Sequence, residues 1–430
     1  MASNTDIRLR NAVIYSIYIR NHTKEGTFRA AEADLPRIRD LGADIVWLMP
    51  IHPIGVLGRK GSLGCPYANR DYRTVNPEYG TLEDFVHFVD AVHSLGMKCM
   101  IDVVYNHTAK DSVLCAEHPE YFYHDENGAF GNRFGDWSDV NDLDYSDPAL
   151  WDYQIESLRY WAQWVDGFRC DVASLVPLDF WKKARAAVAE VRPDCIWLAE
   201  SVHAFFNQAA RRQGLPASTD PEAYAAFDLE YDYDIREALD DYWAGKGRLS
   251  SYIRLLNYQE AVYPSNYIKL RCLENHDQPR IASWYQDPAV LRNWNAFLFF
   301  QKGATLLYGG EERCDANQPS LFDKDPVNWD GPDISDELRH LIQMKKAYFP
   351  ADGWFHGEAD DSTGIVTATF GGADTELVGV FGLEGKTGKA AVVAEDGDYE
   401  NLIDGSTVAV RNGTLRFEGE PVILKRRAQP

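Results

Sequence analysis

Short apolar runs alternate with amphipathic stretches from Ala12 to about Tyr308. Seven of these runs are typical of buried strands: AVIYSIYI (12–19), DIVWLMPI (44–51), KCMIDVVY (98–105), DGFRCDVA (166–173), CIWLAE (195–200), YIKLRCLE (267–274) and ATLLYG (304–309). A weaker eighth candidate, AFDLEYDY (226–233), lies between CIWLAE and YIKLRCLE. Strands that alternate with helices through right-handed crossovers predict an α/β fold with a parallel sheet, and eight strands would close it into a (β/α)8 TIM barrel.

The stretches between the runs carry helical periodicity. AEADLPRIRDLG (31–42) and TLEDFVHFVDAVHSLG (81–96) place apolar residues three and four positions apart, and each ends in a glycine. This spacing forms one apolar helix face, and glycine is common just past a helix C-terminus. The segment 108–145, which is rich in Tyr, Asp, Asn and Gly, is predicted to be a short excursion after the third strand.

From about Phe355 onward the pattern changes to an alternation of apolar and polar residues, as in GIVTATFG (364–371) and TVAVRNGTLRFEG (407–419). A period of two residues indicates strands with one buried face. Asn412-Gly413 is a strong signal for a type I′ turn between two strands. The chain is therefore expected to end in a small antiparallel β domain.

Chain length supports this organisation, because 430 residues suit one large barrel and a smaller module. The content of 45% hydrophobic and 13% aromatic residues provides material for a large core, which argues against disorder. The predicted parts are a first barrel segment (1–107), an inserted excursion (108–145), the remainder of the barrel (146–350) and a C-terminal β-sandwich domain (351–430).

The net charge of -23 repels phosphate backbones and anionic lipids, so we expect neither nucleic acid nor membrane partners. A neutral substrate fits this charge, although the acidity is equally explained as a solvated surface. Seven scattered cysteines without a C-x-x-C pair suggest neither a disulfide framework nor a zinc site. Because MASNTDIRLR also lacks an apolar signal region, a cytoplasmic location is expected. Oligomeric state is not encoded in any motif.

Polar residues follow four of the predicted strands, where barrel enzymes carry their chemistry. The motifs are DVVYNH (102–107), GFRCDVAS (167–174), CIWLAE (195–200) and ENHD (274–277). They deliver His107, Asp171, Glu200 and Asp277 to one rim of the barrel. Carboxylates crowded there would repel unless a cation or a proton offsets them.

Arg169 and Asp171 lie two residues apart in an apolar run and therefore on the same face of a strand. The guanidinium would hold Asp171 ionised and fixed, and lower the pKa of its carboxyl group. A second carboxyl group, kept protonated by its neighbours, could serve as an acid. A fixed anion beside a protonated acid can cleave a glycosidic bond with retention of configuration at the anomeric carbon.

These motifs resemble the α-amylase family, glycoside hydrolase family 13. DVVYNH, GFRCDVAS, WLAES and LENHD are similar to its four ordered signature regions, and CPYANRDYRTVNPEYG (65–80) resembles its loop after the second strand. The resemblance implies that Asp171 is the nucleophile, Glu200 the general acid and base, and Asp277 the transition-state stabiliser. The implied substrate is an α-glucan or maltooligosaccharide.

The resemblance also implies roles for seven further residues. It assigns substrate binding to Tyr67, His107, Arg169 and His276, with Tyr67 as a stacking platform and Arg169 orienting Asp171. It assigns structural positions near the site to Asp71, Asp102 and Asn106. Each has a plainer alternative: Arg169 and Asp171 could be a structural ion pair, Glu200 a helix cap, the histidines satisfied core residues, and Tyr67 core packing.

The residues after the nucleophile depart from the family pattern. Ser174, Leu175 and Val176 stand where many endo-acting relatives carry Lys-His, so one expected calcium contact is missing. Asn106 and the Asp and Asn oxygens of the excursion are of the type that calcium prefers, yet NHTKEGTF (21–28) has no alternating acidic residues. We therefore expect no metal and no cofactor.

Two classes of function remain open. One is a retaining enzyme that hydrolyses α-1,4 links of maltooligosaccharides, or a 4-α-glucanotransferase, another transglycosylase or an α-glucosidase with the same covalent intermediate. The other is a non-catalytic carbohydrate-binding protein on the same fold. Three carboxylates together with Arg169 argue for an enzyme. The preferred chain length, the linkage, and sucrose or trehalose as donor are not determined by these residues.

Overall fold

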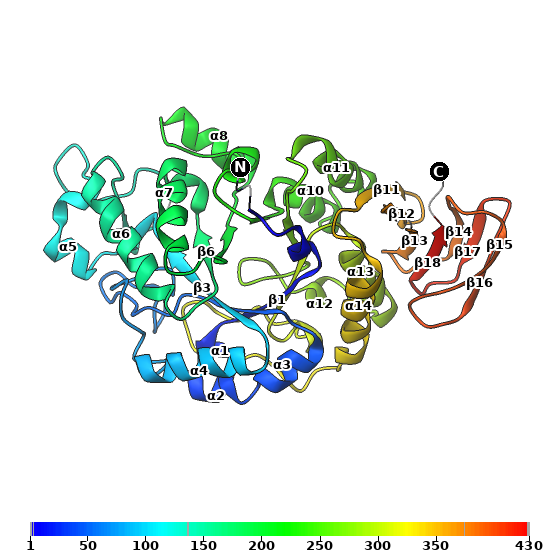
Figure 1. The fold of residues 1–430 in the computed structure, drawn as a ribbon, viewed down its shortest axis with the longest axis horizontal. Coiled ribbons are helices and arrows are strands. Elements are labelled where there is room, and N and C mark those ends of the chain that lie inside the picture. The colour runs from blue at the N-terminus through cyan, green and yellow to red at the C-terminus, as the bar shows by residue number, and fades with distance from the viewer. Residues whose placement is uncertain (1, 3, 136, 374, 428–430) are drawn as a thin grey trace. The chain divides into compact units, whose positions relative to one another are not determined.

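The computed structural model describes residues 2, 4–135, 137–373 and 375–427, so the last three residues of the predicted C-terminal domain lie outside the described part. Within that part, eight strands form a closed barrel in the order β1-β10-β9-β8-β7-β6-β3-β2. Figure 1 labels β1, β3 and β6 among them. The predicted (β/α)8 barrel is confirmed, and the weak candidate at 226–233 is β8. The barrel strands are β1 (Val13–Ile17), β2 (Ile45–Leu48), β3 (Lys98–Val104), β6 (Gly167–Asp171), β7 (Ile196–Ala199), β8 (Leu229–Tyr231), β9 (Lys269–Arg271) and β10 (Ala304–Tyr308).

Helices connect the strands, and the periodic stretch at 81–96 forms one of them. The stretch at 31–42 is divided between the end of one helix and the whole of the next. Gly42 (φ 112°) and Gly96 (φ 78°) follow two of these helices in left-handed conformations, as expected for C-terminal glycines. The helices are α1 (Ile19–His22), α2 (Phe28–Glu32), α3 (Leu35–Leu41), α4 (Leu82–Ser94), α5 (Val113–Glu117), α6 (Pro148–Trp161), α7 (Leu178–Ala189), α8 (Ala204–Arg212), α9 (Asp220–Ala223), α10 (Tyr233–Trp243), α11 (Leu249–Val262), α12 (Ile281–Trp284), α13 (Pro288–Phe300) and α14 (Ser335–Tyr348).

The excursion after β3 is short. It begins with β4 (His107–Ala109), which pairs antiparallel with β5 (Val140–Asp142) and places His107 opposite Asp142. The parallel pairing of β3 with β6 then sets Asp102 beside Arg169 and Val104 beside Asp171. Both strands are buried on both faces, so polar side chains on them must find partners inside the barrel.

The C-terminal part contains two four-stranded antiparallel sheets. Apolar side chains of both sheets form one cluster, which includes Val378, Ala390, Val410 and Phe417. The strands are β11 (Trp354–Asp360), β12 (Ile365–Gly371), β13 (Thr375–Gly382), β14 (Gly388–Ala391), β15 (Gly397–Glu400), β16 (Thr407–Arg411), β17 (Thr414–Phe417) and β18 (Val422–Arg427).

The predicted hairpin turn between β16 and β17 is confirmed. Asn412 (φ 51°) and Gly413 (φ 66°) both have positive φ, which a type I′ turn requires. The carboxylate of Asp396 accepts hydrogen bonds from both backbone N–H groups, at 2.8 and 3.1 Å. The turn is thus stabilised by a side chain as well as by its sequence.

The chain divides into two compact units. The first comprises Met1–Asn4, Ile14–Tyr231 and Pro319–Val327, and the second comprises Thr5–Val13, Asp232–Gln318 and Asn328–Pro430. The candidate residues up to Glu200 belong to the first unit, and His276 and Asp277 belong to the second. None of the helices in the described residues combines the length and hydrophobicity needed to cross a lipid bilayer.

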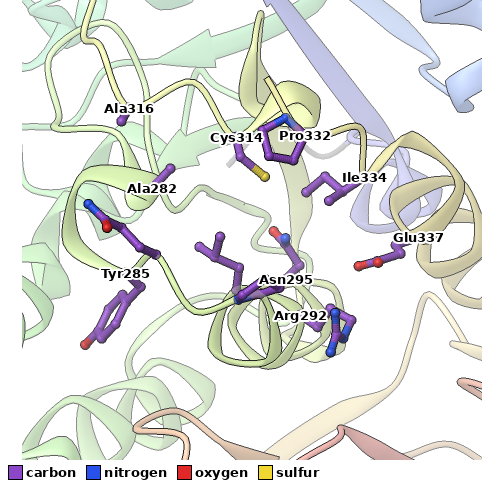
Figure 2. A pocket seen from close by; sticks show the side chains of 12 residues that line it. Ala282, Tyr285, Arg292, Asn295, Cys314, Ala316, Pro332, Ile334 and Glu337 are labelled. Carbon is purple, nitrogen blue, oxygen red and sulfur yellow. The ribbon is translucent and has the colours of Figure 1, made fainter. Parts of the chain in front are cut away.

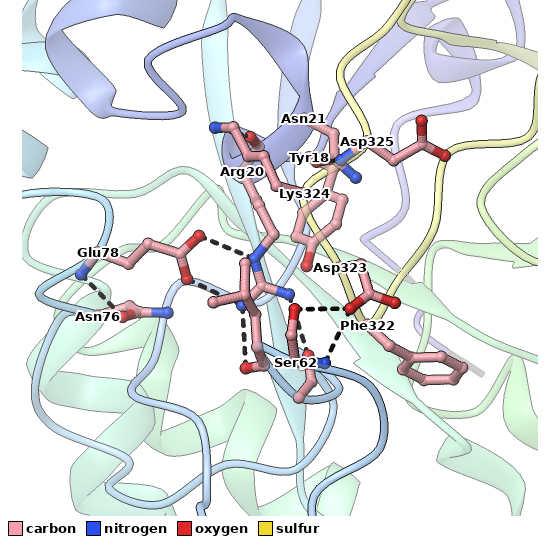
Figure 3. A network of polar contacts seen from close by, with 12 residues as sticks. Tyr18, Arg20, Asn21, Ser62, Asn76, Glu78, Phe322, Asp323, Lys324 and Asp325 are labelled. Atoms are coloured by element: carbon pink, nitrogen blue, oxygen red, sulfur yellow. Dashed lines mark hydrogen bonds and ion pairs between the residues drawn. The ribbon is translucent and has the colours of Figure 1, made fainter.

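A buried arginine in the first unit holds the chain that precedes Tyr67 (Figure 3). The Arg20 guanidinium is fully buried and pairs with Glu78 through Nε at 2.8 Å and Nη2 at 2.9 Å. Its Nη1 donates to the backbone oxygens of Gly64 at 3.0 Å and Leu321 at 3.1 Å. Because one planar cation joins three segments, the loop that carries Tyr67 is anchored on two sides.

His52 is buried after β2 and gives the fold a dependence on pH. Its Nδ1–H donates to the Thr74 backbone oxygen at 3.0 Å, and its ring packs 5.3 Å from that of Trp161. Within the described residues its buried Nε2 has no hydrogen-bond partner. Burial lowers the pKa of His52 from 6.5 to about 4, since the imidazolium would lose its hydration.

Acidification is therefore expected to cost stability through His52. The unfolded chain takes up this proton near pH 6.5 while the folded chain resists it until about pH 4, so stability is lost as pH falls through that window. Replacing His52 with Leu should reduce the loss by about 3 kcal/mol, at roughly 1.4 kcal/mol per pKa unit. Urea unfolding at several pH values measures this. The exposed His356→Leu serves as control, and parallel profiles for wild type and His52→Leu would refute the assignment.

Candidate active site

Arg169 lies at the centre of a buried charge cluster in the first unit. Its side chain is completely buried on β6. Nη1 lies 2.7 Å from Asp171 Oδ1 and 3.0 Å from Asp102 Oδ1, and Nη2 lies 2.9 Å from Glu200 Oε1. One guanidinium therefore holds three carboxylates, from the neighbouring strand β3, from β6 itself and from the end of β7.

Aromatic rings surround the same guanidinium. The Arg169 Cζ lies 5.5 Å from the ring centroids of Trp47 and Tyr67 and 5.4 Å from that of Tyr231. The Tyr67 hydroxyl donates to Asp102 Oδ2 at 3.0 Å. The rings exclude water from the cation and offer it their π faces, which strengthens its contacts with the carboxylates.

Glu200 is held on both of its oxygens. Oε1 pairs with Arg169, and Oε2 accepts the backbone N–H of Val172 at 2.7 Å. Val172 adopts a left-handed conformation with φ 43° and ψ 41°. This conformation is strained for a β-branched residue and occurs mainly at functional sites. Here it turns the N–H that follows Asp171 toward the carboxylate of Glu200.

The charge balance of the cluster shifts two pKa values. Burial disfavours the Arg169 cation, yet the surrounding carboxylates, Asp102 first, raise its pKa well above the usual range. Burial raises the pKa of Asp102 well above the usual carboxyl range; Arg169 opposes this shift, and the anions of Asp171 and Glu200 add to it. Because three carboxylates share one guanidinium, a proton on one of them would relieve their mutual repulsion.

His107 is also buried in the first unit. Its Nδ1 lies 3.1 Å from Asn106 Nδ2, and its ring lies 5.1 Å from that of Trp137. Burial lowers the pKa of His107, so the neutral imidazole is favoured. Asp71 accepts the backbone N–H of Arg73 at 2.9 Å and thus stabilises the turn after the Tyr67 loop.

The remaining two candidates lie in the second unit, after β9. His276 Nε2 lies 3.1 Å from Asp277 Oδ2, and the Asp277 side chain is 38% exposed. The backbone N–H of Asp277 donates to Asn275 Oδ1 at 2.8 Å, and the Gln318 amide donates to the His276 backbone oxygen at 3.0 Å. Asp277 thus combines a fixed backbone with a carboxylate open to solvent.

The structure brings Tyr67, Asp102, Arg169, Asp171 and Glu200 together in one cluster. Sequence reasoning identified these five but missed the contributions of Trp47, Val172 and Tyr231. Trp47 and Tyr231 lie on predicted strands, and their positions next to those strands' ends were a usable signal. Val172 carried none, because a β-branched residue is not expected in a left-handed conformation.

The described residues contain no group of three or more His, Cys, Asp or Glu side chains arranged to hold a metal ion. Asn106 instead contacts His107. Independence from calcium stays a prediction. The cluster on Arg169 by itself offers a fixed carboxylate and a second carboxyl group suited to proton transfer.

The chain is similar to known proteins over nearly its whole length. The family model described as the alpha amylase catalytic domain matches residues 14–127 and 118–351, and the bacterial alpha amylase C-terminal domain matches 356–424. An alpha-amylase from Lactobacillus plantarum is 45% identical, with a TM-score of 0.94, covering 98% of this chain and 100% of that one. A maltogenic alpha-amylase from Thermotoga neapolitana is 35% identical, with a TM-score of 0.86 and coverage of 98% and 100%.

Among curated proteins, similarity extends to transferases. An alpha-1,4-glucan:maltose-1-phosphate maltosyltransferase from Myxococcus xanthus is 32% identical over 45% of this chain and 33% of its own length. The matched region thus spans about a third of the length of the curated relatives of this type. The similarity therefore covers only part of the length of those proteins.

Proposed function

Because the chain belongs to the α-amylase family, we propose that it hydrolyses α-1,4-glucosidic bonds of maltooligosaccharides and other α-glucans with retention at the anomeric carbon. Membership makes it an enzyme of glycosidase or glucanotransferase type that acts on carbohydrate. The observation that carries the finer proposal is the buried Arg169, which holds Asp171 and Glu200 together at the ends of adjacent strands.

In the proposed first step, an Asp171 oxygen attacks the anomeric carbon, while Glu200 gives a proton to the departing glycosidic oxygen. The Arg169 contact with Asp171 Oδ1 fixes the direction of the attack. The bond from sugar to leaving group breaks as the bond to Asp171 forms, which yields a covalent glycosyl-enzyme. Asp277 is proposed to stabilise the positive charge that develops on the sugar.

In the second step, Glu200 takes a proton from water, and the hydroxide oxygen replaces Asp171 on the anomeric carbon. Two inversions give net retention. Tyr67 is proposed as the platform for the sugar ring, and His107 and His276 as donors to its hydroxyl groups. The neutral state favoured for His107 suits this, since a neutral imidazole both donates and accepts.

A second candidate function is glucanosyl transfer, which the names of the maltosyltransferase relatives favour. The same covalent intermediate would then be intercepted by a sugar hydroxyl instead of water. The two outcomes differ only in which acceptor reaches the anomeric carbon, so the carboxylate cluster serves both.

Incubation of the protein with maltoheptaose, followed by separation of products by size over time, tests both candidates. Hydrolysis predicts only shorter sugars, whereas transfer predicts longer sugars beside shorter ones. We expect only shorter sugars, at the same rate with a chelator as with added calcium. Intact maltoheptaose, together with cleavage of sucrose or trehalose, would contradict the proposed substrate, and loss of rate on chelation would contradict metal independence.

A further inference from the structure

Within the second unit, the loop after β9 is closed on itself by hydrogen bonds. Glu274 Oε2 accepts the backbone N–H of Ile281 at 2.8 Å. Inside this loop, Asn275 Oδ1 accepts the backbone N–H groups of Asp277 at 2.8 Å and Gln278 at 3.0 Å. Both Glu274 and Asn275 are buried. Because these contacts join residues of the same loop, they fix its shape, and its place on the barrel depends on contacts with other segments.

Arg280 attaches this loop to the end of β10. Its guanidinium is fully buried, and it donates from Nη1 to Glu274 Oε1 at 2.5 Å and from Nη2 to the backbone oxygen of Gly309 at 2.8 Å. Nε donates to the backbone oxygen of Asn317 at 3.1 Å, and Cζ lies 4.4 Å from the centroid of the Tyr308 ring. Burial disfavours the cation, yet the Glu274 anion, ahead of the other neighbours, raises the pKa of Arg280 above its usual range. One planar cation thus joins the loop after β9 to the chain after β10.

Two neutral hydrogen bonds add to this attachment. Gln318, also after β10, donates from Nε2 to the backbone oxygen of His276 at 3.0 Å. Asn275 Nδ2 donates to the hydroxyl of Tyr233 on α10 at 2.8 Å. Hydrogen bonds between neutral groups are roughly half as strong as those with an ionised partner. The charge-assisted contacts of Arg280 are therefore expected to hold the loop more firmly than either of these two.

A hollow of about 270 Å³ lies between the chain that follows Arg280 and the chain that follows β10. Figure 2 shows Ala282 of the first segment and Cys314 and Ala316 of the second at the edge of this space. A void deprives the side chains on its walls of dispersion contacts. Because apolar packing between the two segments is incomplete here, their relative position depends more strongly on the polar contacts of Arg280.

We propose that Arg280 is a positioning residue, which sets the place of the Asp277 carboxylate and acts on the reaction through it. This inference rests on the proposed role of Asp277 in stabilising positive charge on the sugar. Such stabilisation depends on donors and charges that are already in place, so a carboxylate displaced by about 1 Å loses much of its effect. The alternative is that Arg280 serves only the stability of the fold, as a buried ion pair can.

Arg280→Lys keeps the positive charge but loses the planar fork that binds several acceptors at once. We expect kcat for maltoheptaose to fall on the order of 10²-fold, the scale for a displacement of about 1 Å, with KM within about threefold of wild type. In an Asp277→Asn background the same change should lower kcat by less than about threefold, because no carboxylate remains to be misplaced. Equal losses of kcat in both backgrounds would show a purely structural role and overturn the proposal.

Arg10 provides the matched control in the same unit. Its buried guanidinium donates to the backbone oxygens of Ser265, Tyr267 and Ala351 at 2.7 to 3.0 Å, on the side where β9 begins. Arg10→Lys should therefore lower the melting temperature as Arg280→Lys does, while kcat stays close to that of wild type. An equal loss of kcat in the folded control would attribute the effect to general destabilisation and overturn the proposal.

Glu274→Gln is the second variant, for the case that Arg280→Lys does not fold. The amide has the shape of the carboxylate and can still accept from Ile281, but it removes the anion that holds Arg280. We expect kcat to fall about tenfold or more, the scale for a hydrogen bond to a charged group, and to change little in the Asp277→Asn background. An unchanged kcat, or an equal loss in both backgrounds, would overturn the proposal.

The two proposals fail separately. Calorimetry with 1-deoxynojirimycin, a cation of the size of one sugar, needs no turnover, and its affinity should fall in Asp277→Asn and in Arg280→Lys without a further fall in the double variant. This pattern in a protein that cleaves no glucan would support the role of Arg280 and overturn the proposed activity. Cleavage of maltoheptaose with additive losses of kcat would overturn the role of Arg280 alone. A wild type that neither cleaves a glucan nor binds this cation would overturn both.

Discussion

Replacing Asp171 with Asn is expected to lower turnover of maltoheptaose by on the order of 10⁴-fold or more, the scale of loss when a nucleophile is removed. The amide keeps an oxygen that can accept from Arg169 Nη1, now 2.7 Å from Asp171 Oδ1, so the cluster should retain its geometry. The amide does not form the glycosyl ester, and the first step therefore stops. Product release from maltoheptaose measures the loss.

The matched control for this change lies at the other end of the same strand segment. Asp166 directly precedes β6 and pairs with His93 Nε2 at 2.7 Å, away from the strand end that carries Asp171. Asp166→Asn should leave turnover within a few-fold of wild type, although it removes a partly buried contact. Turnover by Asp171→Asn at a similar level, with maltoheptaose still bound, would instead indicate that Asp171 serves binding or structure and is not the nucleophile.

Replacing Arg169 with Met is expected to have the largest effect on stability. A single buried guanidinium holds Asp102, Asp171 and Glu200, and the variant leaves their charges without a partner. Breaking such a buried pair costs about 3–5 kcal/mol. Urea unfolding near neutral pH should show this loss, and turnover should fall with it because neither Asp171 nor Glu200 remains fixed.

The loss in Arg169→Met should shrink as pH falls, because protonation relieves the carboxylates that lack a counter-charge. Burial already raises the pKa of Asp102, so this group is expected to take up a proton as pH falls. Arg159→Met is the control, since Arg159 pairs with Glu190 at the surface, and it should cost far less stability than Arg169→Met. A stability of Arg169→Met within 1 kcal/mol of wild type would refute the central role of this cation.

The sequence alone determined where along the chain the barrel strands lie, the glycine-terminated helices and the hairpin at Asn412-Gly413. These features depend on local periodicity and on the backbone preferences of single residues. Both are contained in short stretches of neighbouring residues. It also determined which polar residues stand at strand ends, because a parallel barrel delivers those ends to one rim. Arg169, Asp171 and Glu200 were identified on that ground.

Only the tertiary structure decided how these residues share their contacts. The joining of Asp102, Asp171 and Glu200 to one guanidinium depends on the register between β3, β6 and β7, which no local pattern contains. The left-handed Val172 runs against its own preference and is held by the surrounding fold. Non-local packing, which alternation and motif spacing do not encode, therefore fixed the electrostatics of the site.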